Sequence, residues 1–307
     1  MVMDKTIIGV DLGGTKVHSG RIEGYRIVRD FRMNISAQGK PAQVVDEIIA
    51  TIEEVYNSNA AGIGIGVPGP VDVEKGTVYD LINIPAWKEV ELGEILNKRF
   101  GIPVYINNDA NCFAIGEKYF GKARDFKNIV GLIIGTGLGA GLIVDGKLYE
   151  GTNCGAGEVG MIPYRDYNFE YYCSGQFFQN QFKTTGHELA LAAEKKDSQA
   201  LSIFEEFGHH LGKALKAILY AYDPEMIIIG GSVRESFPFF KGSMFTELKD
   251  FSFSRSLKNV VIEVSENDQI ALLGAGALYY DAQLRMVNSG IPENKKAVMN
   301  TTSVSQS

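Results

Sequence analysis

Apolar residues recur along the chain with two different periods. They alternate with small or polar residues, or form short continuous runs, over segments that we expect to be β-strands: 6–22, 61–67, 103–106, 129–144, 226–229 and 260–264. They recur at three- and four-residue spacing over segments that we expect to be helices: 41–57, 91–100, 113–120, 187–196, 198–222, 235–249 and 268–285. Strands that alternate with helices predict a chain of the α/β class.

Glycine-rich turns connect the two strands of each of two expected hairpins. The first is DLGGT at 11–15, with Asp11 at the end of an apolar run, and the second is GTGLGAG at 135–141. Glycine permits a positive φ and lets backbone N–H groups approach an anion, so each turn can hold a phosphate. An ordinary tight hairpin is the alternative for either turn alone. Two copies, roughly 120 residues apart, favour two similar halves that face a shared nucleotide.

Neither turn matches the two common phosphate-binding motifs. The pattern GxxxxGK[ST] is absent, and GTGLGAG leads into a strand where the dinucleotide fingerprint would lead into a helix. A third pair of glycines, Gly230 and Gly231, follows the expected strand 226–229, and a flat nucleoside fits beside such residues.

Polar residues gather where the strand 103–106 ends, at Asn108 and Asp109. Because ligands bind at the carboxyl ends of strands in α/β sheets, Asp109 is a candidate general base. Capping of the following helix is the alternative, and one of the two residues can cap while the other catalyses.

Three further candidate ligands lie in segments without a clear period. Asn83 is polar among apolar residues within 79–92, and Glu158 lies in a loop of small residues. Glu170 is embedded in the aromatic segment 164–178, which we expect to be irregular. Aromatic rings suit the face of a sugar, although the hydrophobic core is the commoner place for them.

Composition excludes several classes of protein. The chain has 307 residues, 45% of them hydrophobic, and a formal net charge of −7, which argues against nucleic acid or an anionic membrane as a partner. We find no signal peptide and no apolar run of the ~20 residues that span a bilayer, so we expect a cytoplasmic protein.

The three cysteines fit reduced thiols rather than a disulfide framework. The pair His209–His210 has no second pair of ligands at metal spacing, so we do not expect it to bind a metal.

Six ordered motifs between about residues 5 and 285 resemble the ROK family of sugar kinases and repressors: DLGGTK at 11–16, GVPGPVD at 66–72, NNDANCFAIGE at 107–117, GTGLGAGLIVDGKLYEG at 135–151, GAGEVG at 155–160 and IIIGGSV at 227–233. The resemblance implies the actin-like ATPase (ribonuclease-H-like) fold, an α/β fold of two lobes around a central cleft. We expect residues 1–107 to form the N-terminal lobe, completed by the helix 268–285, residues 108–267 the C-terminal lobe, and residues 286–307 a disordered tail. The resemblance also implies a homodimer.

The resemblance assigns a role to each candidate residue. Asp109 is implied as the catalytic base, Asn108, Glu158 and Glu170 as sugar ligands, and Asn83 as a further sugar contact. Asp11 would organise Mg²⁺ through water. The expected cofactor is therefore ATP with Mg²⁺. The residues implied to hold its phosphates and adenosine are Gly13, Gly14, Thr15, Lys16, Thr136, Gly137, Gly230 and Gly231.

The chain departs from the family pattern at two places. Many members have a histidine that binds sugar and zinc after GAGExG, where this chain has Met161. They also carry a CxCGxxGCxE zinc loop, which is shorter here, with Asn168 where the last cysteine would be and Glu170 aligned to the final glutamate. Cys173 falls outside the motif, so we expect no structural zinc. Loss of the histidine leaves the identity of the sugar open.

We therefore expect an ATP-dependent kinase that phosphorylates a hexose or N-acetylhexosamine, at C6, with glucose, N-acetylglucosamine, mannose and fructose all open as acceptors. A fructokinase-type acceptor is one alternative. A sugar-responsive repressor is another, disfavoured by the negative charge and by the five residues before the first strand. A regulatory or filament-forming actin-like ATPase would leave Asp109, Glu158 and Glu170 without a role.

Overall fold

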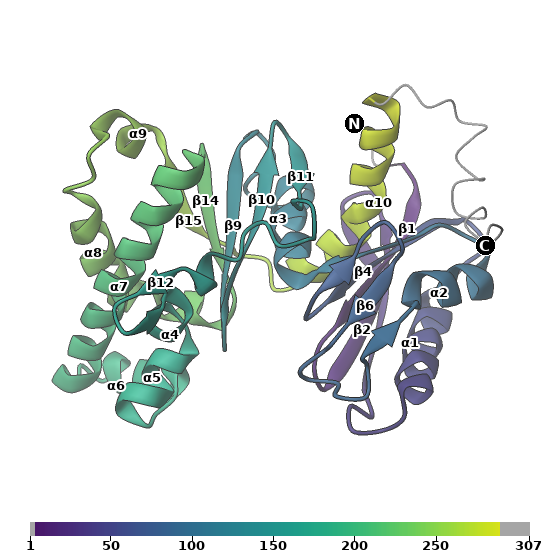
Figure 1. Cartoon of the computed structure of the whole chain (residues 1–307), viewed down its shortest axis with the longest axis horizontal. Helices are drawn as coiled ribbons and strands as arrows, with labels where there is room; N and C mark the ends of the chain where they lie inside the picture. The colour runs from purple at the N-terminus through teal and green to yellow at the C-terminus, as the bar shows by residue number, and fades with distance from the viewer. Residues whose placement is uncertain (1–3, 289–307) are drawn as a thin grey trace.

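The computed structural model describes residues 4–288, which form two lobes that lie side by side (Figure 1). Each lobe is built on a five-stranded sheet, with the strand orders β3-β2-β1-β4-β8 and β11-β10-β9-β14-β15. In each sheet the central strand is antiparallel to the strand that follows it in the chain and parallel to its other neighbour. The two similar halves that the glycine turns predicted are therefore confirmed at the level of topology.

The first lobe contains β1 (Thr6–Leu12), β2 (Lys16–Glu23), β3 (Arg26–Asn34), α1 (Pro41–Val55), β4 (Ala60–Val67), α2 (Leu92–Phe100) and β8 (Val104–Asn108). A small sheet, absent from our expectations, joins β5 (Val71–Asp72), β6 (Thr77–Tyr79) and β7 (Glu89–Val90). Helix α1 packs on β2 and β3 because its apolar face meets the alternating apolar residues of the strands. Within this contact, the buried Thr51 hydroxyl donates to the Ile48 carbonyl (2.8 Å), so the buried Ser19 hydroxyl, 2.8 Å away, donates to Thr51.

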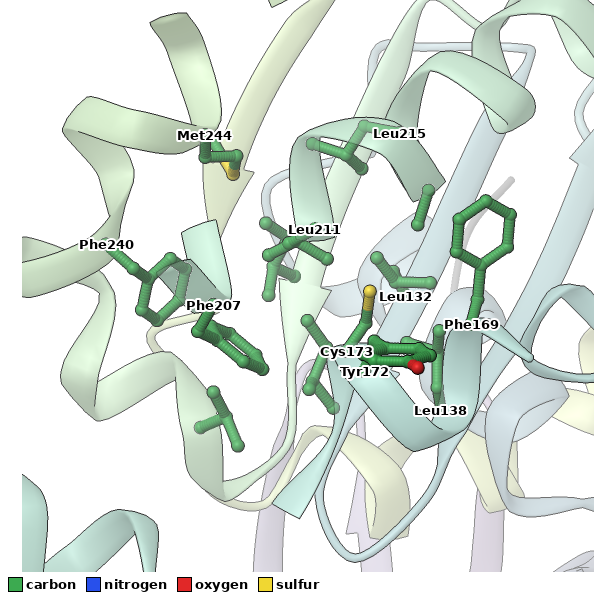
Figure 2. Packing of buried hydrophobic residues seen from close by; sticks show 14 of the residues in the cluster. Leu132, Leu138, Phe169, Tyr172, Cys173, Phe207, Leu211, Leu215, Phe240 and Met244 are labelled. Atoms are coloured by element: carbon green, nitrogen blue, oxygen red, sulfur yellow. The ribbon is translucent and has the colours of Figure 1, made fainter. Parts of the chain in front are cut away.

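The second lobe contains the sheet strands β9 (Ile129–Ile134), β10 (Leu138–Val144), β11 (Lys147–Tyr149), β14 (Met226–Gly230) and β15 (Val261–Val264). Its helices are α4 (Phe169–Cys173), α5 (Gly175–Phe182), α6 (Gly186–Glu194), α7 (Ser198–Tyr222), α8 (Phe237–Leu248) and α9 (Ser254–Asn259). Its shorter elements are the 3₁₀ turns η1 (Val159–Met161) and η2 (Ser232–Ser236) and the two-residue strands β12 (Pro163–Tyr164) and β13 (Tyr167–Asn168). Figure 2 shows the core of this lobe, where side chains of α4 and α7 meet those of the sheet.

We had expected the segment 164–178 to be irregular, but it contains two short helices. Each helix is capped by a side chain. Asn168 accepts a hydrogen bond from the Tyr171 N–H (2.9 Å) and starts α4, and Ser174 accepts one from the Gln176 N–H (3.2 Å) and starts α5. Phe169 and Tyr172 are buried in the hydrophobic core (Figure 2). For these two rings the core interpretation of the aromatic cluster is confirmed.

Two helices connect the lobes, α3 (Asp109–Phe120) and α10 (Ile270–Asn288) (Figure 1). Helix α10 packs on β1 and β4 of the first sheet and on α3. The two helices cross closely at Gly274, where a Cβ would lie 1.7 Å from the Cys112 carbonyl oxygen of α3. Each helix therefore lies directly against the backbone of the other.

Helix α10 extends three residues beyond 285, so residues 286–288 are helical where we had expected the tail to begin. The rest of the expected tail, 289–307, lies outside the described residues. Over the described range 4–288, no helix combines the length and hydrophobicity needed to cross a membrane.

The crossing of α3 and α10 yields a first prediction. Gly274→Ala should lower the free energy of unfolding by about 3 kcal/mol, because the added methyl group meets a backbone carbonyl that cannot turn away. The control is Gly242→Ala in α8, where nothing lies within 4 Å of the added Cβ and alanine should stabilise the helix by about 0.5 to 1 kcal/mol. Urea denaturation of both variants checks this. Equal changes in the two variants would contradict the close crossing.

Candidate active site

The first glycine turn joins β1 to β2 and contacts the loop that carries Asn83. The Gly13 N–H donates to the Lys16 carbonyl (2.8 Å), and the Ile35 N–H donates to the Thr15 carbonyl (2.9 Å), which fixes the turn against the end of β3. A Cβ on Gly14 would lie 2.7 Å from the Cβ of Asn83. The structure thus brings the turn together with Asn83, which is exposed.

The second turn joins β9 to β10 and is held by the junction of α4 and α5. The Ser174 hydroxyl donates to the Thr136 carbonyl (3.0 Å), and the Gly175 N–H donates to the Gly135 carbonyl (2.7 Å). Glu170 accepts a hydrogen bond from the Leu138 N–H (3.1 Å) and another from the Gln176 amide (2.9 Å). Glu170 is therefore tied to the turn, and a Cβ on Gly137 would lie 2.6 Å from its carboxylate.

One physical reason that we gave for these glycines is wrong. None of the glycines at 13–14 or at 135–137, all within the described residues, has a positive φ. Gly14 is instead required by close approach, because the Cβ of Asn83 occupies the space of the missing Cβ, whereas at Gly137 that space is bordered by the end of the Glu170 side chain. At Gly135 that space is open, with no heavy atom within 4 Å.

A cavity of about 540 Å³ lies beside the second turn. Gly135 and Thr136 line one side of it, and the opposite wall comes from the α5–α6 segment and from η2. Gly230 and Gly231, which precede η2, do not line the cavity: a Cβ on Gly230 would meet Phe113 at 2.4 Å, and one on Gly231 would meet the Ile134 carbonyl at 2.3 Å.

Most of the side chains that line the cavity were not among the candidate residues predicted from the sequence. Its polar lining includes Gln176, Asn180, Thr185, His187 and Ser232. Only Ser232 carried a signal, since it directly follows the glycine pair after a buried strand. The others lie on α5 and α6 and face the cavity only because those helices fold back beside the turn.

Asp109 is the first residue of α3 and follows the carboxyl end of β8. Asn108 caps the helix, because its side-chain oxygen accepts a hydrogen bond from the Asn111 N–H (2.7 Å). The capping alternative therefore holds for this residue. Its side-chain N–H groups take no part in that bond. Asp109 accepts one from the Ala110 N–H (2.8 Å). Its carboxyl is reached by solvent although protein surrounds it on most sides.

Carboxyl groups of both lobes influence one another electrostatically. Burial, followed by the charge of Asp109, raises the pKa of Asp11 from 3.8 to about 6, against an opposing effect of Arg32. Burial raises the pKa of Asp109, against its backbone hydrogen bonds. Burial and then the charges of Asp109 and Glu170 raise the pKa of Glu158. The structure thus brings together Asp11, Asp109, Glu158 and Glu170, as the sequence analysis required for one site.

These residues fit ATP and Mg²⁺. The open face of Gly135 borders a cavity large enough for a nucleoside. Asp11 and Asp109 are hard oxygen donors whose mutual repulsion a divalent cation would offset.

The two positions where the chain departs from the zinc pattern lie against each other. The Asn168 amide nitrogen lies 3.9 Å from the thioether sulfur of Met161, which is exposed, whereas Cys173 is fully buried. Within residues 4–288, no three His, Cys, Asp or Glu side chains are grouped so as to hold a metal ion. His210 is buried with its Nδ1 atom 3.1 Å from the Tyr164 hydroxyl, in keeping with a core imidazole. The absence of structural zinc stays a prediction.

Comparison with known proteins places this site in a family. The chain is 29% identical to the glucokinase of Thermotoga maritima, over 89% of this chain and 96% of that protein. It is 30% identical to the xylose repressor of Bacillus subtilis, over 91% of this chain and 78% of the repressor. The solved structure of a ROK family glucokinase from Streptomyces griseus, in complex with glucose and AMPPNP, superposes with a TM-score of 0.74 at 25% identity, over 89% of this chain and 98% of that one.

The structural likeness confirms the actin-like ATPase fold. The family model described as ROK matches residues 7–282, and on this match the chain belongs to the ROK family.

Proposed function

We propose that the chain is an ATP-dependent sugar kinase that transfers the γ-phosphoryl group to a hydroxyl of a hexose or N-acetylhexosamine, at C6. The observation that carries the proposal is the position of Asp109. It is an accessible carboxylate at a helix N-terminus, and its charge helps to raise the pKa values of Asp11 in the first lobe and of Glu158 in the second. The similarity to a glucokinase over most of both chains supports it.

In this proposal Asp109 accepts the proton of the attacking sugar hydroxyl as the O–P bond forms. An alcohol is a weak nucleophile until that proton is removed, so a carboxylate beside it accelerates the transfer. The raised pKa of Asp109 makes it a stronger base than an exposed aspartate.

The remaining residues bind and orient the two substrates. Asn108 can donate through its amide nitrogen, since its oxygen caps α3, and Glu158 can accept from sugar hydroxyls. Both oxygens of Glu170 already accept one hydrogen bond each, so it orients the second turn as well as any sugar near it. In this proposal Asp11 organises Mg²⁺, and Thr15, Lys16 and Thr136 hold the phosphates. Bound Mg²⁺·ATP supplies the phosphoryl group and the charge neutralisation.

A sugar-responsive regulator is the second candidate function, and the similarity to a xylose repressor over 91% of the chain favours it. A regulator would bind sugar at the same site without consuming ATP. A coupled assay of ADP release across a panel of hexoses, N-acetylhexosamines and xylose separates the two. A sugar that raises ADP release supports the kinase. If calorimetry shows that a sugar binds but no sugar raises ADP release above background, the kinase function is rejected.

The role of Asp109 gives a direct test. Asp109→Asn should lower kcat by about 10² to 10⁴-fold, because asparagine keeps the shape and removes the base. In the parent, kcat/KM should fall as the pH drops through the raised pKa of Asp109, at a pH above the ordinary 3.8. Steady-state kinetics between pH 4 and 9 measure both effects, and an Asp109→Asn variant of full activity would exclude this residue as the base.

The raised pKa of Asp11 predicts a pH-dependent effect on stability. A folded-state pKa of about 6 against 3.8 means that this group favours folding fully below pH 3.8, and that the contribution is lost as the pH rises through 6. Asp11→Asn should therefore stabilise the ligand-free protein by about 1 to 3 kcal/mol at pH 8 and hardly at all near pH 4. Urea denaturation at both pH values measures this, with the exposed Asp166→Asn as the control for losing one charge. Equal gains at both pH values would contradict it.

The cavity beside the second turn predicts a selective effect on nucleotide binding. Ala190 lines the cavity, and Ala190→Phe should fill part of it and raise the KM for ATP at least about tenfold, with the KM for sugar little changed. The neighbouring Leu191 is exposed and does not line the cavity, so Leu191→Phe is a matched control. If both constants rise together, the cavity is not the nucleotide site.

A further inference from the structure

The end of β8, just before Asp109, is held by the side chain of Asn107. This residue is 1% exposed. Its side-chain oxygen Oδ1 accepts hydrogen bonds from the backbone N–H of Asn108 (2.9 Å) and from the side-chain amide of Asn111 (2.8 Å). Asn107 therefore orients both the cap residue and the first turn of α3. The direction of the Asp109 side chain depends on that first turn.

Asn107 is itself held from a distant part of the chain. Its amide donates to one oxygen of Glu150, just after β11, at 2.6 Å. The other oxygen of Glu150 pairs with the guanidinium of Arg285, near the end of α10, at 2.7 Å. A continuous chain of direct bonds thus runs from the last helix to the residue that orients the cap of α3.

Arg285 occupies a position that only an arginine can fill. Its Nε donates to Asp281 (2.7 Å) and one Nη to the Leu148 carbonyl (2.8 Å), while the other Nη binds Glu150. The side chains of Glu150 and Asp281 are only 13% and 4% exposed, so their charges need this partner. A lysine ammonium retains the charge but lacks the planar fork that reaches three acceptors at once.

We propose that Arg285 is a positioning residue for Asp109, acting through Glu150 and Asn107. The proposal rests on the proposed kinase function, since a positioned base matters only if the base is used. A general base must be held within a fraction of an ångström of its working position, and this set of bonds fixes the backbone on which Asp109 stands. Arg285 lies outside residues 7–282, the part of the chain that the family model matches, so the family match assigns no role to this residue.

Two conservative variants test the connection without leaving a buried carboxylate wholly unpaired. Arg285→Lys keeps a cation, and Glu150→Gln keeps an oxygen that accepts from Asn107. Each should lower kcat about 5- to 30-fold and leave the KM for ATP within about twofold, because the second turn and its cavity stay in place while Asp109 is misplaced. Since the two residues act in series, the double variant should lose no more than the stronger single variant.

The matched control is Lys216→Met. Lys216 is a partly buried cation, 12% exposed, that pairs with Glu247 between α7 and α8 in the second lobe, outside the proposed site. Its loss should lower stability and leave kcat within about twofold. An unchanged kcat in Arg285→Lys, additive losses in the double variant, or an equal loss of kcat in the control would each overturn the proposal.

A second measurement does not depend on activity. Amide hydrogen exchange of Ala110 and Asn111, whose N–H groups bind Asp109 and Asn108, should be at least about tenfold faster in Arg285→Lys than in the parent and unchanged in Lys216→Met. Unchanged exchange in Arg285→Lys overturns the positioning role. If the parent releases no ADP with any sugar, the proposed function fails instead, and the exchange comparison still decides whether Arg285 positions the first turn of α3.

Discussion

The contact on which most of this structure depends is the approach of α10 to the backbones around it. A Cβ on Gly64 of β4 would lie 1.7 Å from the Ala275 carbonyl, and one on Gly274 would lie 1.7 Å from the Cys112 carbonyl of α3. One helix is therefore fixed against a sheet of the first lobe and against the helix that begins with Asp109. Glycine makes this possible because backbones can approach without side chains between them. The position of the candidate base relative to the first lobe follows from it.

The candidate site stores electrostatic free energy that the fold has to offset. Burial raises the pKa values of Asp11, Asp109 and Glu158, so all three charges are held at a cost in the ligand-free protein. Such groups concentrate where a protein binds cations or moves protons. In the network of Arg285, Glu150 and Asp281 the buried carboxylates have a cationic partner, and Arg285 opposes the burial that raises the pKa of Asp281.

The sequence predicted the parts of the structure that periodicity and turn chemistry determine. The strands around both glycine turns, the long helix α7 and the repeat of topology follow from local pattern. The helices α4 and α5 did not, because their aromatic residues face a core formed by distant elements and their start depends on the caps Asn168 and Ser174. Similarly, the motifs made Asp109 and Glu170 candidates, but the bonds of Glu170 to the second turn and the link from Asn107 to Arg285 join residues far apart in sequence. No local pattern predicts such contacts.

The chain has one tryptophan, and its place in the fold makes it a natural optical probe of a single lobe. Trp87 is fully buried in the core of the first lobe, and its indole N–H donates to the Pro41 carbonyl at the start of α1 (3.3 Å). It lies four residues after Asn83 in the same loop, which contacts the first glycine turn. The second lobe contains phenylalanine and tyrosine but no tryptophan among its described residues. Tryptophan emission therefore reports on the first lobe and on the loop that carries Asn83, while events confined to the second lobe leave it largely unchanged.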